Sequence, residues 1–246
     1  MDHAELAATA RTLVEGKPRT FAELGALLGE VWPGVDTNAL AQAGRAMLPL
    51  VQVPPRGLWG RSGQAAHTTA EQWLGRPLAT PDPAEAVTRY LAAYGPATIK
   101  DIQTWCGLTR LREVVRTLDL LTFQGEDGAV LYDLPDAPRP GEEVEAPVRF
   151  LPEFDNILLS YADRTRVMSE ESRKRVFTVN GIIRSTILVD GEVRGMWKIA
   201  SKRGAATLTI EPFSPLSVSE QELLAAEGAR LLEFAASDAG HDLVFQ

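Results

Sequence analysis

The stretch TIKDIQTWCGLTRLREVVRTLDLLTFQGEDGAVLYDL, residues 98–134, contains the signals of two helices and a β-hairpin in direct succession. Thr98 and Asp101 have the spacing of a capping box, which begins a helix, and Gly107 ends that helix. Thr109 then predicts the start of a further helix over Arg110–Leu118. We therefore expect two helices joined by a short turn in front of the hairpin.

The predicted hairpin consists of strands at Leu120–Gln124 and Ala129–Asp133. The turn between them, Gly125–Gly128, contains the Gly and Asp residues that adopt the positive φ of tight hairpins. A helix at about 83–93 precedes the whole stretch and ends at Gly95-Pro96. Three helices followed by a hairpin are typical of the winged-helix variant of the helix-turn-helix.

The same order of signals occurs earlier in the chain, so the sequence contains an internal repeat. Thr20–Leu24 has the same Thr-x-x-acid-aliphatic pattern as Thr98–Ile102. The first copy is expected to have helices at about 4–15, Thr20–Trp32 and from Asp36 or Thr37 to Met47, then strands at Leu50–Val53 and about Ala65–Thr68 around the loop Pro54–Gly63. We predict two tandem winged-helix units, at residues 1–78 and 81–135.

A different pattern follows the repeat. Residues 136–147, DAPRPGEEVEAP, are rich in Pro, Gly and acid and are typical of a linker. Beyond them, residues 148–246 contain mainly strand-like runs, with a helix that Ser217 caps and that extends to about Ala236. The fold class is predicted to be α+β, with a β-barrel-like domain or strongly curved sheet at the C-terminal end and one helix packed on it.

Composition limits the class of protein. An apolar fraction of 45% with 24% charged residues is ordinary for a globular protein and argues against disorder. No apolar run approaches the roughly 18–20 residues of a membrane span, and the N-terminus has no features of a secretory signal. Cys106, the single cysteine, cannot form an internal disulfide, which suits a reducing compartment. We expect a cytoplasmic protein; the oligomeric state is left open.

Charge is distributed unevenly along the chain. The net charge is −8, yet residues 148–210 carry +4 while residues 81–147 and 211–246 each carry −6. Binding to phosphates depends on a local positive face rather than on the total charge. The acidic total therefore weakens the case for a nucleic-acid partner without excluding double-stranded DNA.

Ten basic side chains are candidate DNA contacts. They lie in the first wing, in the third helix of the second copy and in a basic cluster further on: Arg56, Arg61, Arg110, Arg112, Arg116, Arg164, Arg166, Arg173, Lys174 and Arg175. Two alternatives remain open. Surface arginines are mostly solvated, and Glu170 and Glu171 precede the last three basic residues, so part of the cluster balances a helix dipole. Three-helix units with a hairpin also serve as protein-interaction modules.

Other residues with possible chemistry give weaker signals. Trp32, Trp73 and Trp105 are expected in the core, whereas Trp59 lies in the Gly- and Arg-rich wing and is expected to be exposed. The three histidines lack partners at ligand spacing, and no phosphate-binding or nucleophile motif is present, so no metal and no cofactor are expected. Glu153 and Asp155 are the paired carboxylates of interest; turn capping and an ion pair with Arg164 or Arg166 are the favoured interpretation.

Several stretches resemble the winged-helix DNA-binding family that contains the AlkZ-type and YcaQ-type DNA glycosylases. The stretches are LVQVPPRGLWG (Leu50–Gly60), HTTAEQWL (His67–Leu74), AAYGP (Ala92–Pro96), LYDL (Leu131–Leu134) and LPEFDNILLSYADRTRV (Leu151–Val167). The last is the most specific of them. The resemblance implies tandem winged helices with a C-terminal β-barrel, duplex DNA bound on a concave surface, and excision of alkylated or crosslinked bases.

The chain departs from that family in one respect that concerns catalysis. Family members begin with a further winged-helix segment that holds a catalytic Gln-x-Gln or Gln-x-Asp motif, and this chain is expected to begin partway through the pattern. None of its glutamines has Gln or Asp two residues on. Since excision needs a fixed amide or carboxylate to position water, a non-catalytic duplex DNA binder is the leading hypothesis. An active glycosylase that uses Glu153 or Asp155, and a protein-interaction module, are the alternatives.

Overall fold

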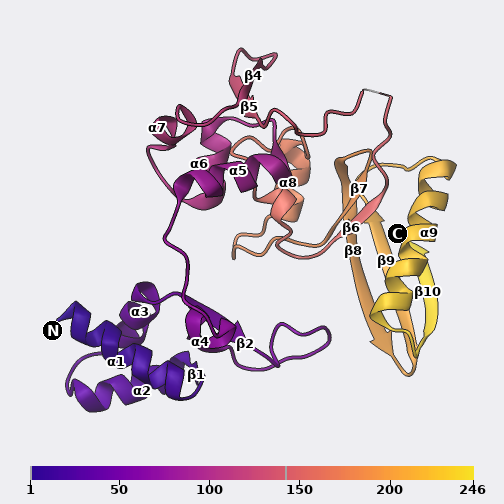
Figure 1. Cartoon of the computed structure of the whole chain (residues 1–246). Helices are drawn as coiled ribbons and strands as arrows, with labels where there is room; N and C mark the ends of the chain where they lie inside the picture. Colours follow the sequence, from indigo (N-terminus) through magenta and orange to yellow (C-terminus); the bar gives the residue numbers. More distant parts are fainter. Residues whose placement is uncertain (1, 142) are drawn as a thin grey trace. The chain divides into compact units, whose positions relative to one another are not determined.

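The computed structural model describes residues 2–141 and 143–246. The chain divides into two compact units, Met1–Pro81 and Asp82–Gln246, which are described separately below (Figure 1). The two units meet after Pro81, and the sequence placed the boundary between residues 78 and 81. The mixed α+β class predicted from the sequence is confirmed, since helices and antiparallel sheet occur in both units.

The first unit combines a helical core with a small sheet. Its elements are α1 (His3–Gly16), β1 (Arg19–Thr20), α2 (Phe21–Val31), α3 (Thr37–Met47), β2 (Leu50–Val53), β3 (Ala66–Thr69) and α4 (Ala70–Leu74). The strands form an antiparallel sheet in the order β1-β3-β2. Buried side chains of α1, α2 and α3 make one apolar core, which includes Leu6, Leu28 and Leu40.

Local signals explain where α2 begins and how closely it packs. Thr20 and Glu23 form the predicted capping box, in which each side chain accepts a hydrogen bond from the other residue's backbone N–H. Gly25 then faces α3: a Cβ atom at this position would lie 2.7 Å from the carbonyl oxygen of Thr37. Because only a residue without a side chain fits there, the two helices approach each other closely enough to bury Leu24 and Leu40.

The second unit begins with a similar order of elements. These are α5 (Pro83–Tyr94), α6 (Ile99–Cys106), α7 (Leu111–Val115), β4 (Leu121–Gln124) and β5 (Val130–Asp133). As expected, a capping box of Thr98 and Asp101 begins α6, and Gly107 ends it in the left-handed conformation. Strands β4 and β5 pair antiparallel as the expected hairpin.

The third helix of this copy is shorter than predicted. The prediction placed Arg110–Leu118 in the helix, but α7 covers only Leu111–Val115. Arg110 has a φ of 61°, a left-handed conformation that does not belong to a right-handed helix. After Val115 the chain tightens into i→i+3 hydrogen bonds, from Thr117 N–H to Val114 O and from Leu118 N–H to Val115 O.

The remainder of the second unit is a sheet with one long helix. Its elements are β6 (Arg149–Leu151), η1 (Asn156–Leu158, a 3-10 turn), α8 (Glu170–Val176), β7 (Thr186–Val189), β8 (Glu192–Lys202), β9 (Ala205–Pro212), α9 (Val218–Ala235) and β10 (Gly240–Phe245). The strand order is β10-β9-β8-β7-β6, with β10 parallel to β9 and the other pairs antiparallel. Figure 1 shows α9 along one face of this sheet.

The sheet is open, so the barrel-like closure expected from the sequence is wrong for the strands that the structure describes. A barrel requires its first and last strands to pair, whereas the strand order here ends at β6 and β10. The apolar face is covered by α9, whose Leu224 and Leu232 pack on Ile187 and Leu208 of the sheet. Burial of that face by a helix removes the need for the sheet to close on itself.

The second copy of the repeat packs directly on the segment that follows the predicted linker. The Tyr90 hydroxyl donates a hydrogen bond to the carbonyl oxygen of Ser160 at 2.8 Å, and the Tyr161 hydroxyl donates to the carbonyl oxygen of Tyr94 at 3.0 Å. Residues 82–246 therefore form one compact unit, although the sequence suggested separate segments at 81–135 and 148–246. Within the described part of the chain, no helix is both long and apolar enough to cross a membrane.

Candidate nucleic-acid interface

The first candidate surface lies between α7 and the β4–β5 hairpin. A hollow of about 550 Å³ opens there, and its charged lining residues are Lys100, Arg112 and Arg116, with no carboxylate among its described lining residues. Arg112 and Arg116 are exposed and take part in none of the ion pairs found among the described residues. The structure thus brings together two of the three arginines expected on this helix. Arg110 lies outside the hollow.

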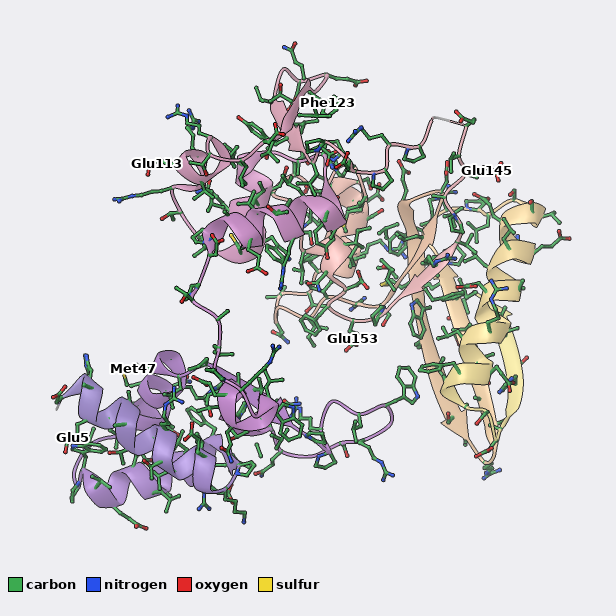
Figure 2. The ribbon with its side chains drawn as sticks, viewed as in Figure 1. Glu5, Met47, Glu113, Phe123, Glu145 and Glu153 are labelled. Atoms are coloured by element: carbon green, nitrogen blue, oxygen red, sulfur yellow. The ribbon has the colours of Figure 1, made fainter. Side chains whose placement is uncertain are left out.

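Apolar and hydroxyl groups form the rest of this hollow. Leu118, Leu120 and Tyr132 contribute apolar surface, and Thr98 and Thr122 contribute hydroxyls. Figure 2 shows Glu113 on α7 and Phe123 on the hairpin; these two elements and the start of α6 line the hollow. A concave surface with three cations and several hydroxyls suits an anion such as a backbone phosphate.

The second candidate surface is the loop that joins β2 and β3 in the first unit, residues 54–65, which corresponds to the predicted wing. Arg56 is exposed and joins the two sides of this loop: its Nη1 donates to the carbonyl oxygen of Gly63 at 3.3 Å, and its own carbonyl accepts a hydrogen bond from Gln52 Nε2 at 3.1 Å. Arg61 is exposed. As expected, Trp59 is exposed as well, at 61% of its surface, beside Leu58 at 52%.

Helix α3 carries exposed polar residues that are not among the ten basic candidates. Asn38, Gln42 and Arg45 are all exposed, and their spacing of four and three residues places them on one face of the helix. The opposite face buries Leu40 and Ala41. The signal was present in the sequence, because Asn, Gln and Arg at this spacing are the side chains that make paired hydrogen bonds to base edges.

The charge of this region is positive throughout. From Thr37 to Ala70, which covers α3, β2, the wing and β3, the chain has three arginines and no Asp, Glu or Lys. Arg45 lies over the Phe21 ring with its Cζ 5.5 Å from the centroid. Burial, together with the charge of Arg45, lowers the pKa of His67 below its usual value.

The basic cluster at residues 164–175 is engaged largely within the fold. Arg164 Nε donates to the carbonyl oxygen of Leu158 at 2.7 Å, and its Cζ lies 5.2 Å from the centre of the Phe177 ring. Arg166 Nη1 donates to the carbonyl oxygen of Pro96 at 3.1 Å, and its Cζ lies 4.4 Å from the centre of the Tyr161 ring. Both arginines therefore connect loops of the second unit, and any role in DNA binding stays a prediction.

The three basic residues of α8 differ in their partners. Arg173 pairs with Glu170 at 3.0 Å, and Arg175 pairs with Glu211 at 3.4 Å. Lys174 is exposed and belongs to none of the ion pairs among the described residues. Glu170 and Glu171 lie in the first turn of α8 and the three basic residues in its last turn, which is the placement that the helix-dipole interpretation expects. Lys174 is accordingly the residue of α8 best placed for an external anion.

Glu153 and Asp155 have separate environments. Asp155 Oδ1 accepts a hydrogen bond from Ile157 N–H at 2.9 Å and caps η1, as the capping interpretation predicted. Figure 2 shows Glu153 in the loop after β6. It lines a hollow of about 480 Å³ together with Arg184 and Lys198. The predicted ion pair of either carboxylate with Arg164 or Arg166 is wrong, because those guanidinium groups contact backbone carbonyls and rings instead.

The tryptophans expected in the core have different positions. Trp32 packs against the core of the first unit, as predicted. Trp73 is 53% exposed, so that prediction is wrong: it lies on the five-residue α4, where only Ala70 is buried. Trp105 is 38% exposed, so its placement in the core is wrong as well, although its ring centroid lies 5.4 Å from that of Tyr90.

Comparisons with known proteins agree with one another. The family model described as "DNA glycosylase AlkZ-like" matches residues 1–234. A protein of Streptomyces sahachiroi described as "Interstrand DNA cross-link repair glycosylase" is 31% identical over 169 residues, which is 61% of this chain and 44% of that protein. The chain thus spans less than half the length of this relative.

A solved structure, described as Streptomyces sahachiroi DNA glycosylase AlkZ, has the same fold. It superposes with a TM-score of 0.73 and 23% identity, and the match covers 99% of this chain and 69% of the solved one. An identity this low supports the fold alone, whereas the family match extends over almost all of the sequence. The chain therefore belongs to the AlkZ-like family of DNA glycosylases.

Proposed function

We propose that this chain binds duplex DNA through its two three-helix-and-hairpin segments, acting as tandem winged helices. The observation that carries the proposal is the acid-free run from Thr37 to Ala70, which places one arginine on the third helix and two in the wing. In a chain of net charge −8, such a run provides the local positive face that phosphate binding requires. In the winged-helix arrangement the third helix and the wing are the elements that face DNA.

The second unit supports the same conclusion independently. The equivalent elements there, α7 and the β4–β5 hairpin, enclose the hollow lined by Lys100, Arg112 and Arg116. Neither arginine is compensated by an ion pair within the described chain, so both are available to phosphates. Two positive surfaces on equivalent elements of a repeat favour a partner that is itself periodic and anionic, as duplex DNA is.

For this chain by itself we propose binding to duplex DNA as it occurs in repair, without base excision. The relative with 31% identity is named as a glycosylase that repairs interstrand DNA crosslinks. Its name supports DNA as the partner that we propose for this chain. Excision is left out of the proposal because no Gln-x-Gln or Gln-x-Asp motif occurs in this sequence. The resemblance assigns the positioning of water to that motif.

Binding is tested with the full chain and a fluorescein-labelled duplex of mixed sequence, by anisotropy at about 50 mM salt. We expect nanomolar to micromolar affinity that falls linearly on a plot of log K against log salt concentration. Replacement of Arg173, Lys174 and Arg175 by Glu is expected to lower affinity several-fold, chiefly through Lys174. A chain that binds no duplex at this salt concentration contradicts the proposed function.

One observation favours a second candidate, an active glycosylase. Glu153 lines a hollow of about 480 Å³ that Arg184, Lys198 and Glu211 also line, so two carboxylates and two cations share a concave site. Release of free base from alkylated or crosslinked duplexes, followed by chromatography, tests this candidate. Activity lost in Glu153→Gln and kept in Asp155→Asn supports it. No release from several lesions by the full chain removes it.

A further inference from the structure

One face of helix α3 carries a row of hydrogen-bonding side chains. Asn38, Gln42 and Arg45 are exposed, and their spacing places them on the same side of the helix. The two side-chain amides make no hydrogen bond to another residue in the part of the chain that the structure describes. Their donors and acceptors are therefore open to a partner that presents both kinds of group.

The side chains next to this row are small. Ala39 and Ala46 are exposed on the same helix, so nothing bulky keeps the polar row away from a partner surface. The major groove of duplex DNA is wide enough to admit one α-helix. Between Asn38 and Arg45 the helix rises about 10 Å, which is the height of about three base pairs.

Helix α3 is held in place by its own unit. Asp36 Oδ1 accepts a hydrogen bond from Ala39 N–H at 2.7 Å and caps the helix. Gly29 of α2 faces the first turn, since a Cβ atom on it would lie 2.8 Å from Thr37 Cγ2. On the inner side, Leu40 is part of the apolar core. A face presented by a fixed helix loses little conformational entropy on binding.

The chemistry of the row identifies its partner. The amide of Asn or Gln pairs with N6 and N7 of adenine through two hydrogen bonds, and the guanidinium of Arg pairs with O6 and N7 of guanine. These base edges are presented in the major groove. No carboxylate occurs between Asp36 and Glu71, so no acidic side chain of this stretch repels the phosphates on either side of the groove.

The equivalent helix of the second copy has a different chemistry. Helix α7 covers five residues, Leu111–Val115, and contains neither Asn nor Gln. Arg112 on this helix and Arg116 at its end line the hollow beside the hairpin together with Lys100. Positive charges without paired amides suit phosphates, which carry no sequence information. The two copies of the repeat thus present different groups to a partner.

We propose that α3 lies in the major groove and that Asn38, Gln42 and Arg45 recognise a sequence of about three base pairs, while the second copy holds the phosphate backbone. The two amides recognise adenines and the guanidinium recognises a guanine. The chain therefore prefers two A·T pairs next to a G·C pair. The inference rests on the proposed function and adds to it the residues that determine sequence preference.

The first test is selection by the full chain from a duplex library with a randomised centre, followed by sequencing of the bound fraction. We expect enrichment of the A·T and G·C pairs. The enriched duplex is then compared with a shuffled duplex of the same composition by fluorescence anisotropy. We expect the native chain to bind the enriched duplex about ten-fold more tightly or better.

Single variants assign the preference to α3. Gln42→Ala is expected to lower affinity for the enriched duplex about five-fold or more and to remove the preference at one base pair. Asn38→Ala is expected to do the same at a neighbouring pair. Unchanged affinity for the shuffled duplex shows that both variants fold. Arg112→Ala is expected to weaken binding to both duplexes by the same factor. Gln72→Ala is the matched control, since it removes an exposed glutamine of the same unit outside α3.

A modified base tests for contact in the major groove. 7-Deazaadenine lacks the N7 acceptor and still pairs with thymine. At the adenine assigned to Gln42, it is expected to weaken binding of the native chain about five-fold. It is expected to have no further effect on Gln42→Ala, because the same hydrogen bond has already been lost in that variant.

The results separate this inference from the proposed function. If the native chain binds duplexes but enriches no sequence, duplex binding stands and base recognition by α3 is wrong. The inference is also overturned if the preference survives in both Asn38→Ala and Gln42→Ala, or if 7-deazaadenine weakens binding of Gln42→Ala as much as that of the native chain. A native chain that binds no duplex overturns both.

Discussion

Tyr90 and Ser160 are separated by 70 residues in sequence, and the Tyr90 hydroxyl donates a 2.8 Å hydrogen bond to the Ser160 carbonyl oxygen. Both residues are fully buried, and burial raises the pKa of the Tyr90 phenol. The bond joins α5 of the repeat to the LPEFDNILLSYADRTRV stretch. The family-specific stretch is therefore part of what holds the second unit together.

Tyr90→Phe is expected to lower the free energy of unfolding by about 1–3 kcal/mol, because it leaves the Ser160 carbonyl buried without a donor. Urea unfolding followed by circular dichroism measures the change as a lower midpoint at unchanged slope. Tyr132→Phe is the matched control, since its hydroxyl has no hydrogen-bond partner among the described residues. Equal stability of both variants would contradict the structural role of the Tyr90 bond.

Arg112→Ala and Arg116→Ala are each expected to reduce the slope of log K against log salt concentration by about 0.9, the value for one lost phosphate contact. Arg164→Ala provides the contrast. Its guanidinium contacts the Leu158 carbonyl and the Phe177 ring, so we expect lower stability and an unchanged slope. Anisotropy titrations at four or five salt concentrations distinguish the two outcomes. If the slope changes only in Arg164→Ala, the phosphate contacts belong to the cluster at residues 164–175 and not to Arg112 and Arg116.

Gly228→Ala is expected to destabilise the second unit by about 1–3 kcal/mol through overpacking. A Cβ at this position of α9 would lie 2.7 Å from Leu243 Cδ1 and 2.8 Å from Leu208 Cδ2. Gly16→Ala is the control, because a Cβ there meets nothing within 4 Å and alanine suits a helix better than glycine. The midpoint temperature of thermal unfolding measures both effects. Midpoints of both variants above that of the native protein would show that α9 tolerates a wider separation from the sheet.

The first unit is expected to lose stability as the pH falls below about 6.5, the ordinary pKa of histidine. Burial and Arg45 lower the pKa of His67 in the folded chain, so the unfolded chain takes up the proton first. Protonation then favours unfolding, and the loss is complete once the pH has passed below the folded-state pKa. His67→Gln is expected to flatten this dependence, measured by urea midpoints between pH 7.5 and 5. An unchanged profile would show that other groups dominate it.

Features that depend on neighbouring residues were predicted well from the sequence. The capping boxes of Thr20 and Thr98, the helix end at Gly107 and the β4–β5 hairpin all agree with the structure, because each is stabilised by hydrogen bonds or φ preferences within a few residues. The same applies to the exposure of Trp59. The polar face of α3 follows from the same local periodicity, since Asn38, Gln42 and Arg45 are three and four residues apart.

Features that depend on distant partners were not predictable in this way. The sequence predicted DNA contacts for the basic cluster at residues 164–175. In the structure, Arg166 contacts the Pro96 carbonyl and Arg175 pairs with Glu211. Arg110 was expected inside a helix and instead takes a left-handed φ at its start. Trp73 has a large apolar side chain of the kind expected in a core, but it lies on a helix that is too short to bury it.

The sequence by itself determined the order of the helices and hairpins, the family and the acid-free run from Thr37 to Ala70, since each of these is written in the spacing and type of nearby residues. The tertiary structure decided that the C-terminal sheet stays open under α9, that the second copy joins that sheet through Tyr90 and Ser160, and which arginines remain available to an external partner. The physical reason is that ion pairs, hydrogen bonds and burial depend on contacts between residues that are far apart in the sequence. The local periodicity of the sequence carries no information about those long-range contacts.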